Sequence, residues 1–166
     1  MLQTAYRRGT KDSDVLETQD LDAATQRHLR ALAGNGSPLH GSYRLYLEVV
    51  PAGLPFLPQA CRWHPQTVLN ARLTSFEVAA LDVTDVVVSK LKRFSASDAN
   101  DVEAMVTNGH VKHDELVARF LSAVDVCSHG ANGTDLPEYV DNLHRVERDF
   151  FGVTKTDVEL PPWCER

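Results

Sequence analysis

Two aspartates separated by one residue, Asp12 and Asp14, are the side chains whose spacing first suggests chemistry in this sequence. They stand at the start of an apolar segment, with Val15 and Leu16 next, that predicts a β-strand. Because side chains alternate along a strand, residues two apart lie on the same face. Two carboxylates so placed can share a pair of Mg²⁺ ions, which prefer oxygen ligands and bridge the phosphates of a triphosphate.

A second Asp-x-Asp pair, Asp20 and Asp22, shows how little this spacing means by itself. It precedes an amphipathic segment, where an acidic residue is expected to cap a helix and to favour its first turn. We expect Asp20 to cap a helix that ends at Gly34 to Gly36. The neighbours of the first pair must therefore decide what that pair does.

Alternating and helical patterns divide the chain into a first half rich in strands and a second half rich in helices. Strands are expected over 43–50 and 73–81, and helices over 83–94, 98–106, 115–127 and 136–151. In 83–94 a run of valines favours a strand, but Thr84 as a cap and apolar residues at helical spacing favour the helix that we predict. The last three helices are expected to be capped by Ser97, Asp114 and Thr134.

This order of elements predicts an α+β fold in a single domain over 1–166. Residues 1–82 would form mainly a sheet, 83–152 a helical half packed on it, and 153–166 an extended tail.

Two blocks of residues resemble the abortive-infection (AbiEii-like) branch of the nucleotidyltransferase superfamily. Residues 8–15, Arg-Gly-Thr-Lys-Asp-Ser-Asp-Val, resemble its Arg-x-Thr-x-Asp-x-Asp turn and strand. Residues 85–91, Asp-Val-Val-Val-Ser-Lys-Leu, are similar to its helix from an acid to Ser-Lys-Leu, and Asp98 and Asp101 to its closing Asp-x-x-Asp. The resemblance implies a mixed sheet of the nucleotidyltransferase type with a helical C-terminal half.

The activity that the resemblance implies is a Mg²⁺-dependent transfer of a nucleotide from an NTP to an RNA or protein hydroxyl. Asp12 and Asp14 would hold two metal ions together with a third carboxylate from a neighbouring strand. Glu48, in the middle of a predicted strand, is the candidate, and Glu77 on the next predicted strand is the alternative. The family also includes the toxins of toxin–antitoxin pairs, which implies an antitoxin protein as a partner.

Four basic or polar residues complete the expected site. By the resemblance, Arg8, Thr10 and Lys90 would bind the nucleotide, and Lys90 would reach into the catalytic cleft. Lys90 has a second interpretation as the partner of an aspartate in the Asp-x-x-Asp pair. Arg93 is expected to form a structural ion pair with one of the same two aspartates.

Two departures from the family pattern put catalysis in question. Ser13 stands where the family generally has an aliphatic residue, and no Gly-Gly or Gly-Ser pair occurs in the eleven residues before Asp12. In the superfamily the backbone amides at that glycine pair bind the triphosphate. The sequence therefore predicts weak NTP binding, and a catalytically degenerate member acting as a binding or regulatory partner is the alternative function.

Composition limits the class of protein and its expected location in the cell. The chain has 166 residues, a formal net charge of −6 and 43% hydrophobic residues, which is typical of a globular protein and argues against general capture of nucleic acid by charge. Its three cysteines form no Cys-x-x-Cys pair, and neither a signal peptide nor a membrane-spanning run is evident. We expect a cytoplasmic protein with no membrane partner.

Overall fold

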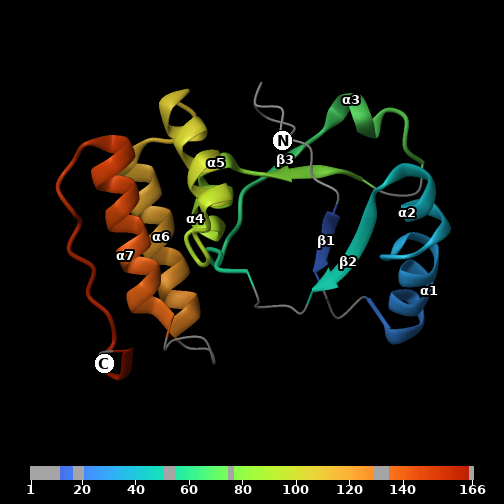
Figure 1. The fold of residues 1–166 in the computed structure, drawn as a ribbon, viewed down its shortest axis with the longest axis horizontal. Helices are drawn as coiled ribbons and strands as arrows, with labels where there is room; N and C mark the ends of the chain where they lie inside the picture. Colours follow the sequence, from blue (N-terminus) through green and yellow to red (C-terminus); the bar gives the residue numbers. More distant parts are fainter. Residues whose placement is uncertain (1–11, 17–20, 51–54, 75–76, 129–134, 165–166) are drawn as a thin grey trace. The chain divides into compact units, whose positions relative to one another are not determined.

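A computed structural model confirms the α+β class and describes residues 12–16, 21–50, 55–74, 77–128 and 135–164 (Figure 1). The chain divides into two compact units, a smaller one formed by Arg7–Pro55 and a larger one that contains Phe56–Arg166. Whether both belong to one folding domain stays a prediction.

The smaller unit contains two strands and the two helices that connect them. Its elements are β1 (Asp12–Leu16), α1 (Ala23–Ala33), α2 (Pro38–Tyr43) and β2 (Tyr46–Val50). The strands pair in parallel, and α1 packs against β2 (Figure 1). Parallel strands need a connection long enough to return the chain to the same end, and the two helices supply it.

Helix α1 begins after Asp22, whose carboxylate accepts a hydrogen bond from the backbone N–H of Thr25 at 2.6 Å. The prediction that Asp20 is the cap was therefore wrong, because the carboxylate of Asp22 is the one that reaches the third amide of the helix; Asp20 lies outside the described residues. Gly34 ends the helix and donates its N–H to the carbonyl of Arg30 at 2.9 Å. A Cβ at Gly34 would lie only 2.5 Å from that carbonyl oxygen, so this close approach requires glycine.

Helix α2 was not predicted, and β2 begins at Tyr46, later than the strand predicted over 43–50. Ser37 accepts a hydrogen bond from the backbone N–H of His40 at 3.2 Å, and Pro38 occupies the first helical position, where its fixed φ is favourable. Arg44 ends the helix in the left-handed region with φ of 59°. A six-residue helix shows too little periodicity to be recognised, so the strand was predicted to start too early.

The larger unit opens with a short antiparallel ladder around one helical turn: β3 (Trp63–Pro65), α3 (Thr67–Asn70) and β4 (Ala79–Leu81). Of the strand predicted over 73–81, the described residues confirm only the last three. The Asn70 side chain donates to the Val78 carbonyl at 2.9 Å and accepts from the Val78 N–H at 2.7 Å. Asn70 thereby occupies the Val78 N–H, while the Val78 carbonyl also accepts from the backbone N–H of Gln66 at 2.9 Å.

A helical bundle forms the rest of the larger unit. Its elements are α4 (Val83–Lys90), α5 (Ala96–Thr107), α6 (His113–Ser128), α7 (Leu136–Val146) and the π-helical turn η2 (Glu147–Phe151). The helix predicted over 83–94 is confirmed, although it ends at Lys90 and is capped by Asp82, which accepts from the N–H of Thr84 at 2.9 Å. The helix predicted over 136–151 changes to π-helical geometry at its last five residues.

The start of α5 differs from the prediction by two residues. Ser95 and not Ser97 is the cap: its hydroxyl accepts from the Asp98 N–H at 3.3 Å, and Asp98 accepts from the Ser95 N–H at 3.1 Å. This reciprocal capping box explains the shift, because it needs an acidic residue three positions after the serine. Phe94 takes a positive φ of 42° and turns the chain from α4 toward this cap.

The caps predicted for the last two helices have different outcomes. Helix α6 begins at His113, so Asp114 lies in its first turn and is not the cap. Thr134 lies outside the described residues. The residue before α7 is Asp135, which makes no capping hydrogen bond through its side chain. An acidic residue at either place still favours the positive end of its helix.

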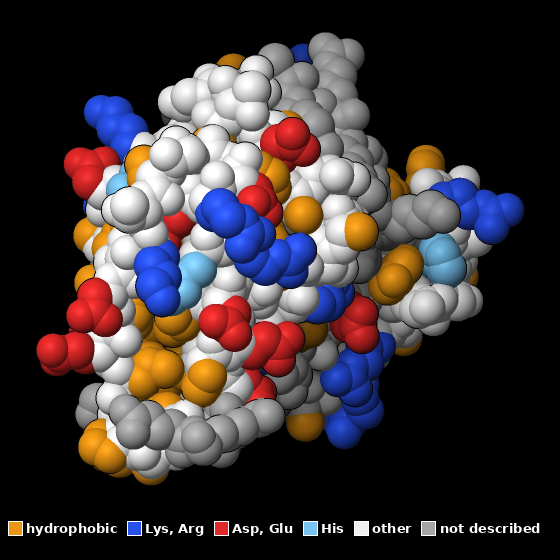
Figure 2. Space-filling model, turned by 60° about the vertical axis from the view of Figure 1, so that its left-hand side comes forward, with side chains coloured by type: hydrophobic (Ala, Val, Ile, Leu, Met, Phe, Trp, Pro, Cys, Tyr) orange, Lys and Arg blue, Asp and Glu red, His pale blue; other side chains and the backbone are white. Residues whose placement is uncertain are grey.

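The hydrophobic core of the described residues lies in the larger unit, where α6 lies between α4 and α7 (Figure 1). Phe120 of α6 is fully buried, and its ring centroid lies 5.3 Å from that of Phe56. Phe56 also packs against Tyr139 of α7 at 4.9 Å, so one aromatic residue near the start of the unit joins two helices. On the face in Figure 2, acidic and basic side chains are interspersed and form no single basic field.

Residues 152–161 form neither a helix nor a strand, and a short 3-10 turn, η3 (Pro162–Cys164), follows, in which Cys164 is buried. An extended tail over 153–166 stays a prediction. Within the described residues, no helix combines the length and the apolar character that crossing a membrane requires.

Candidate active site

The parallel ladder of the smaller unit brings the predicted acidic positions together. The register pairs the Cα of Asp12 with that of Tyr46 and the Cα of Asp14 with that of Glu48. Glu48 is exposed and belongs to the neighbouring strand, as the sequence predicted. Arg8 and Thr10, the predicted nucleotide ligands before β1, lie outside the described residues.

Glu77, the alternative third carboxylate, lies in a different setting. It is exposed and precedes β4, in the larger unit, instead of standing within a strand. The backbone pairing of Asp14 therefore involves Glu48, and Glu77 has no corresponding place in that ladder.

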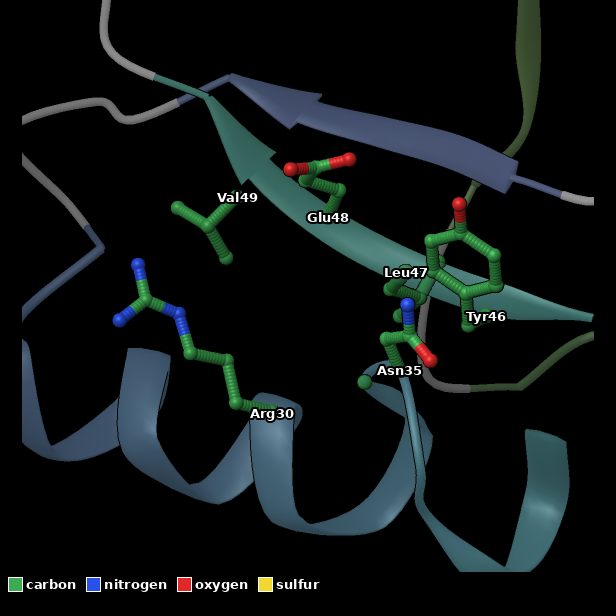
Figure 3. Close-up of a pocket in the computed structure, with 7 residues that line it drawn as sticks. Arg30, Asn35, Tyr46, Leu47, Glu48 and Val49 are labelled. Carbon is green, nitrogen blue, oxygen red and sulfur yellow. The ribbon is translucent and has the colours of Figure 1, made fainter. Parts of the chain in front are cut away.

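A pocket of about 330 Å³ lies between the end of α1 and strand β2 (Figure 3). It is lined by Arg30, Gly34, Asn35, Tyr46, Leu47, Glu48 and Val49. Figure 3 shows the Arg30 side chain extending from α1 toward β2. Arg30 of the helix and Glu48 of the strand both line the pocket, and Figure 3 shows the Glu48 carboxylate directed toward β1, away from the Arg30 side chain.

Lys90, at the end of α4, lies in an ion-pair cluster of the larger unit. Its Nζ donates to Asp98 Oδ1 at 3.1 Å and to Asp101 Oδ2 at 2.9 Å. The Lys90 side chain is only 20% exposed, and that of Asp98 is 4% exposed. This is the ion-pair arrangement that the sequence offered as the second interpretation of Lys90. A contact between Lys90 and a nucleotide stays a prediction.

Asp98 is the centre of this cluster. Arg93 donates to it from Nε at 3.1 Å, which confirms the structural ion pair expected for Arg93. Burial opposes ionisation of Asp98, but hydrogen bonds from the two cations and from Ser95 outweigh it and hold the pKa of Asp98 well below its usual range. Asp98 is therefore ionised, and it joins the end of α4 to the start of α5.

The bundle contains a buried charge pair that was not predicted from the sequence. Asp85 is fully buried and accepts from Arg119 Nε at 2.6 Å and Nη2 at 2.7 Å, in the two-point geometry typical of arginine and carboxylate. The backbone N–H of Arg62 also donates to Asp85 at 2.9 Å, and Arg119 also donates to the Ala60 carbonyl. The pair holds α4, α6 and the segment before β3 together. Its partners are too far apart in sequence for any spacing pattern to reveal them.

A second buried acid, Glu147, holds the C-terminal segment. His113 Nε2 lies 2.8 Å from Glu147 Oε1, the backbone N–H of Thr156 donates to Oε2 at 3.0 Å, and the Thr156 hydroxyl donates to Oε1. Burial opposes ionisation of Glu147, yet the hydrogen bonds from Thr156 and His113 lower its pKa below the ordinary value. This arrangement orders the tail against α6 and η2, and we assign it a structural role.

The chemistry of the donors in the smaller unit suits a hard cation, because Asp and Glu oxygens are the ligands that Mg²⁺ prefers. The described residues contain no group of three or more His, Cys, Asp or Glu side chains that could hold a metal ion. The fit therefore rests on the register of Asp14 with Glu48.

Comparison with known proteins identifies a nucleotidyltransferase family. A family model described as "Nucleotidyltransferase of unknown function (DUF6036)" matches residues 1–150. The match includes both the block around Asp12 and Asp14 and the block around Lys90. No curated protein and no solved structure matches the chain.

Proposed function

Because the chain belongs to this family of nucleotidyltransferases, we propose that it transfers a nucleotide from an NTP to a hydroxyl of an RNA or a protein, with Mg²⁺ as the cofactor. The observation that carries the proposal is the register of Asp14 with Glu48 on adjacent parallel strands. Since side-chain positions alternate along both strands, positions 12, 14 and 48 share one face of this ladder. The resemblance to the abortive-infection branch supports a cytoplasmic toxin that is paired with an antitoxin protein.

In this proposal Asp12, Asp14 and Glu48 hold the metal ions. Bound Mg²⁺ supplies neutralisation of the charge that develops on the phosphates. Glu48 accepts the proton of the acceptor hydroxyl. The acceptor oxygen forms a bond to the α-phosphorus, the bond from that phosphorus to its bridging oxygen breaks, and pyrophosphate leaves. Arg8, Thr10 and Lys90 bind the nucleotide phosphates.

The second candidate is a degenerate family member that binds or regulates a partner without catalysis. The observation that favours it is the state of Lys90, whose ammonium is already neutralised by Asp98 and Asp101. A lysine that donates to two carboxylates must give up these hydrogen bonds before it can bind a phosphate, which weakens its contribution to nucleotide binding.

Transfer of label from α-³²P-labelled NTPs to RNA and to protein tests the first candidate. We expect transfer that requires Mg²⁺, is accompanied by pyrophosphate release, and is lost in Asp14→Asn. Asp22→Asn is the matched control, because asparagine caps a helix as well as aspartate does and only the charge changes. If no NTP labels any acceptor, or if Asp14→Asn transfers at the wild-type rate, the catalytic proposal is wrong.

A second pair of variants decides the third carboxylate. Glu48→Gln should abolish transfer, whereas Glu77→Gln should leave it unchanged, because only Glu48 is paired with the Asp14 strand. The opposite result would assign the role to Glu77.

A further inference from the structure

Helices α1 and α2 expose a surface that is both apolar and positively charged. We propose that this surface binds an acidic amphipathic segment of a partner protein. The inference rests on the proposed function only in identifying that partner as the antitoxin. The surface consists of exposed side chains of the two helices and of the residues after them: Arg27, His28, Leu32, Leu39, Tyr43, Arg44 and Leu45.

The apolar part of this surface lies on α2 and on both sides of it in sequence. Leu39 and Tyr43 stand four residues apart, so they lie on the same side of α2, and Tyr43 is 70% exposed. Leu32 before the helix and Leu45 after it are also exposed, and α1 packs against α2 (Figure 1). Single exposed apolar side chains are ordinary, but four large ones within 32–45 indicate a surface that another molecule covers.

The charge of these two helices favours an acidic partner. Residues 23–47 contain no Asp or Glu, although the whole chain has a formal net charge of −6. Within the described part of the chain, no carboxylate forms an ion pair with Arg27 or Arg44. A segment that carries carboxylates beside apolar side chains therefore complements both properties of the surface.

The side of α1 that packs on β2 is not part of this surface. Leu29 and Ala33 are half-buried and four residues apart, and Figure 3 shows the Arg30 side chain extending toward β2. Arg27 and Leu32 are exposed, so a partner can reach them without displacing α1 from the strand.

Two other occupants fit the surface less well. A second copy of the chain bound face to face would place arginines against arginines, and like charges oppose such a contact. RNA would gain from the arginines, but proteins bind single-stranded RNA largely by stacking its bases on aromatic side chains. Three of the four large apolar side chains here are aliphatic, which favours a protein segment.

The test is selection of peptides from a random-peptide library displayed on phage, with the wild-type chain as the target. We expect the enriched peptides to combine Asp or Glu with apolar residues. The Kd of the most enriched peptide, measured by fluorescence anisotropy, should rise about tenfold in Tyr43→Ala and in Arg44→Gln.

The matched controls are Val68→Ala and Arg72→Gln, which change an exposed valine and an exposed arginine of the larger unit. Both should leave the Kd within about twofold of the wild-type value. Equal melting temperatures of the five proteins would confirm that each is folded.

The outcomes separate this inference from its alternatives and from the catalytic proposal. Enrichment of no peptide, or of peptides that lack acidic residues or bind all five proteins equally, overturns it. An oligoribonucleotide or a self-association in analytical ultracentrifugation that depends on Tyr43 and Arg44, without an acidic peptide, overturns it in favour of that occupant. Peptide binding without nucleotide transfer supports the surface and rejects catalysis, whereas transfer without peptide binding rejects the surface alone.

Discussion

The two units of this chain differ in where their stability and their candidate chemistry lie. In the larger unit, side chains of α4 to α7 form a continuous buried core. In the described residues of the smaller unit no apolar side chain is fully buried, and Leu32 is 57% exposed. Yet the smaller unit contains the paired acidic positions and the pocket with Arg30. A two-stranded ladder is marginal by itself, so we expect the candidate site to lie in the less stable part of the protein.

The largest effect that tests this contrast is expected from the core. Phe120→Ala removes a fully buried ring that packs against Phe56, and it should lower the free energy of unfolding by about 3–5 kcal/mol. Leu32→Ala, at an exposed site of the smaller unit, should change it by no more than about 0.5 kcal/mol. Urea denaturation of both variants measures the two effects. Similar losses would show that the smaller unit has a core of its own.

A pH effect is expected from the buried acid of the larger unit. The pKa of Glu147 is lowered in the folded state, so its ionised form stabilises the protein at pH values above the ordinary pKa of 4.5. That contribution should be lost as the pH falls through the lowered folded-state pKa. We expect the stability of the wild type to fall more steeply than that of Glu147→Gln as the pH falls below 4.5, as followed by denaturation at each pH.

The control for this pH effect is Asp149, which is exposed and carries its own ion pair to Arg148. Asp149→Asn should keep the wild-type slope, because exposed pairs contribute little to stability. If Glu147→Gln and the wild type lose stability in parallel, Glu147 does not supply the acid sensitivity.

The smallest effect compares the same cap chemistry in both units. Ser95→Ala removes the capping box of α5 and should lower the global unfolding free energy by about 1 kcal/mol. Asp22→Ala removes the cap of α1, and we expect faster hydrogen exchange of the α1 amides with the main thermal transition unchanged. If Asp22→Ala lowers that transition as much as Ser95→Ala does, the two units unfold together.

Local signals in the sequence predicted many of the elements but not their boundaries. The apolar spacing of 83–94 correctly indicated a helix against the strand preference of its valines, because packing on one face outweighs intrinsic propensity. Helix α2 was missed because six residues are too few to show a helical period. The late start of β4 was missed because the Val78 N–H donates to the Asn70 side chain, a contact that the alternating pattern of 73–81 does not reveal. Cap positions were off by two residues at both Asp22 and Ser95 for a similar reason: several polar residues compete there, and geometry selects one.

By itself, the sequence determined the α+β class and the relation to nucleotidyltransferases, since residue types and short spacings carry both. The abortive-infection branch stays a prediction. Only the tertiary structure decided which distant residues meet: Glu48 in register with Asp14, Arg119 on Asp85, and His113 and Thr156 on Glu147. The physical reason is that ladder register and buried ion pairs depend on how whole elements pack. Contacts of this kind join residues tens of positions apart, and no local pattern of charge or hydropathy specifies them.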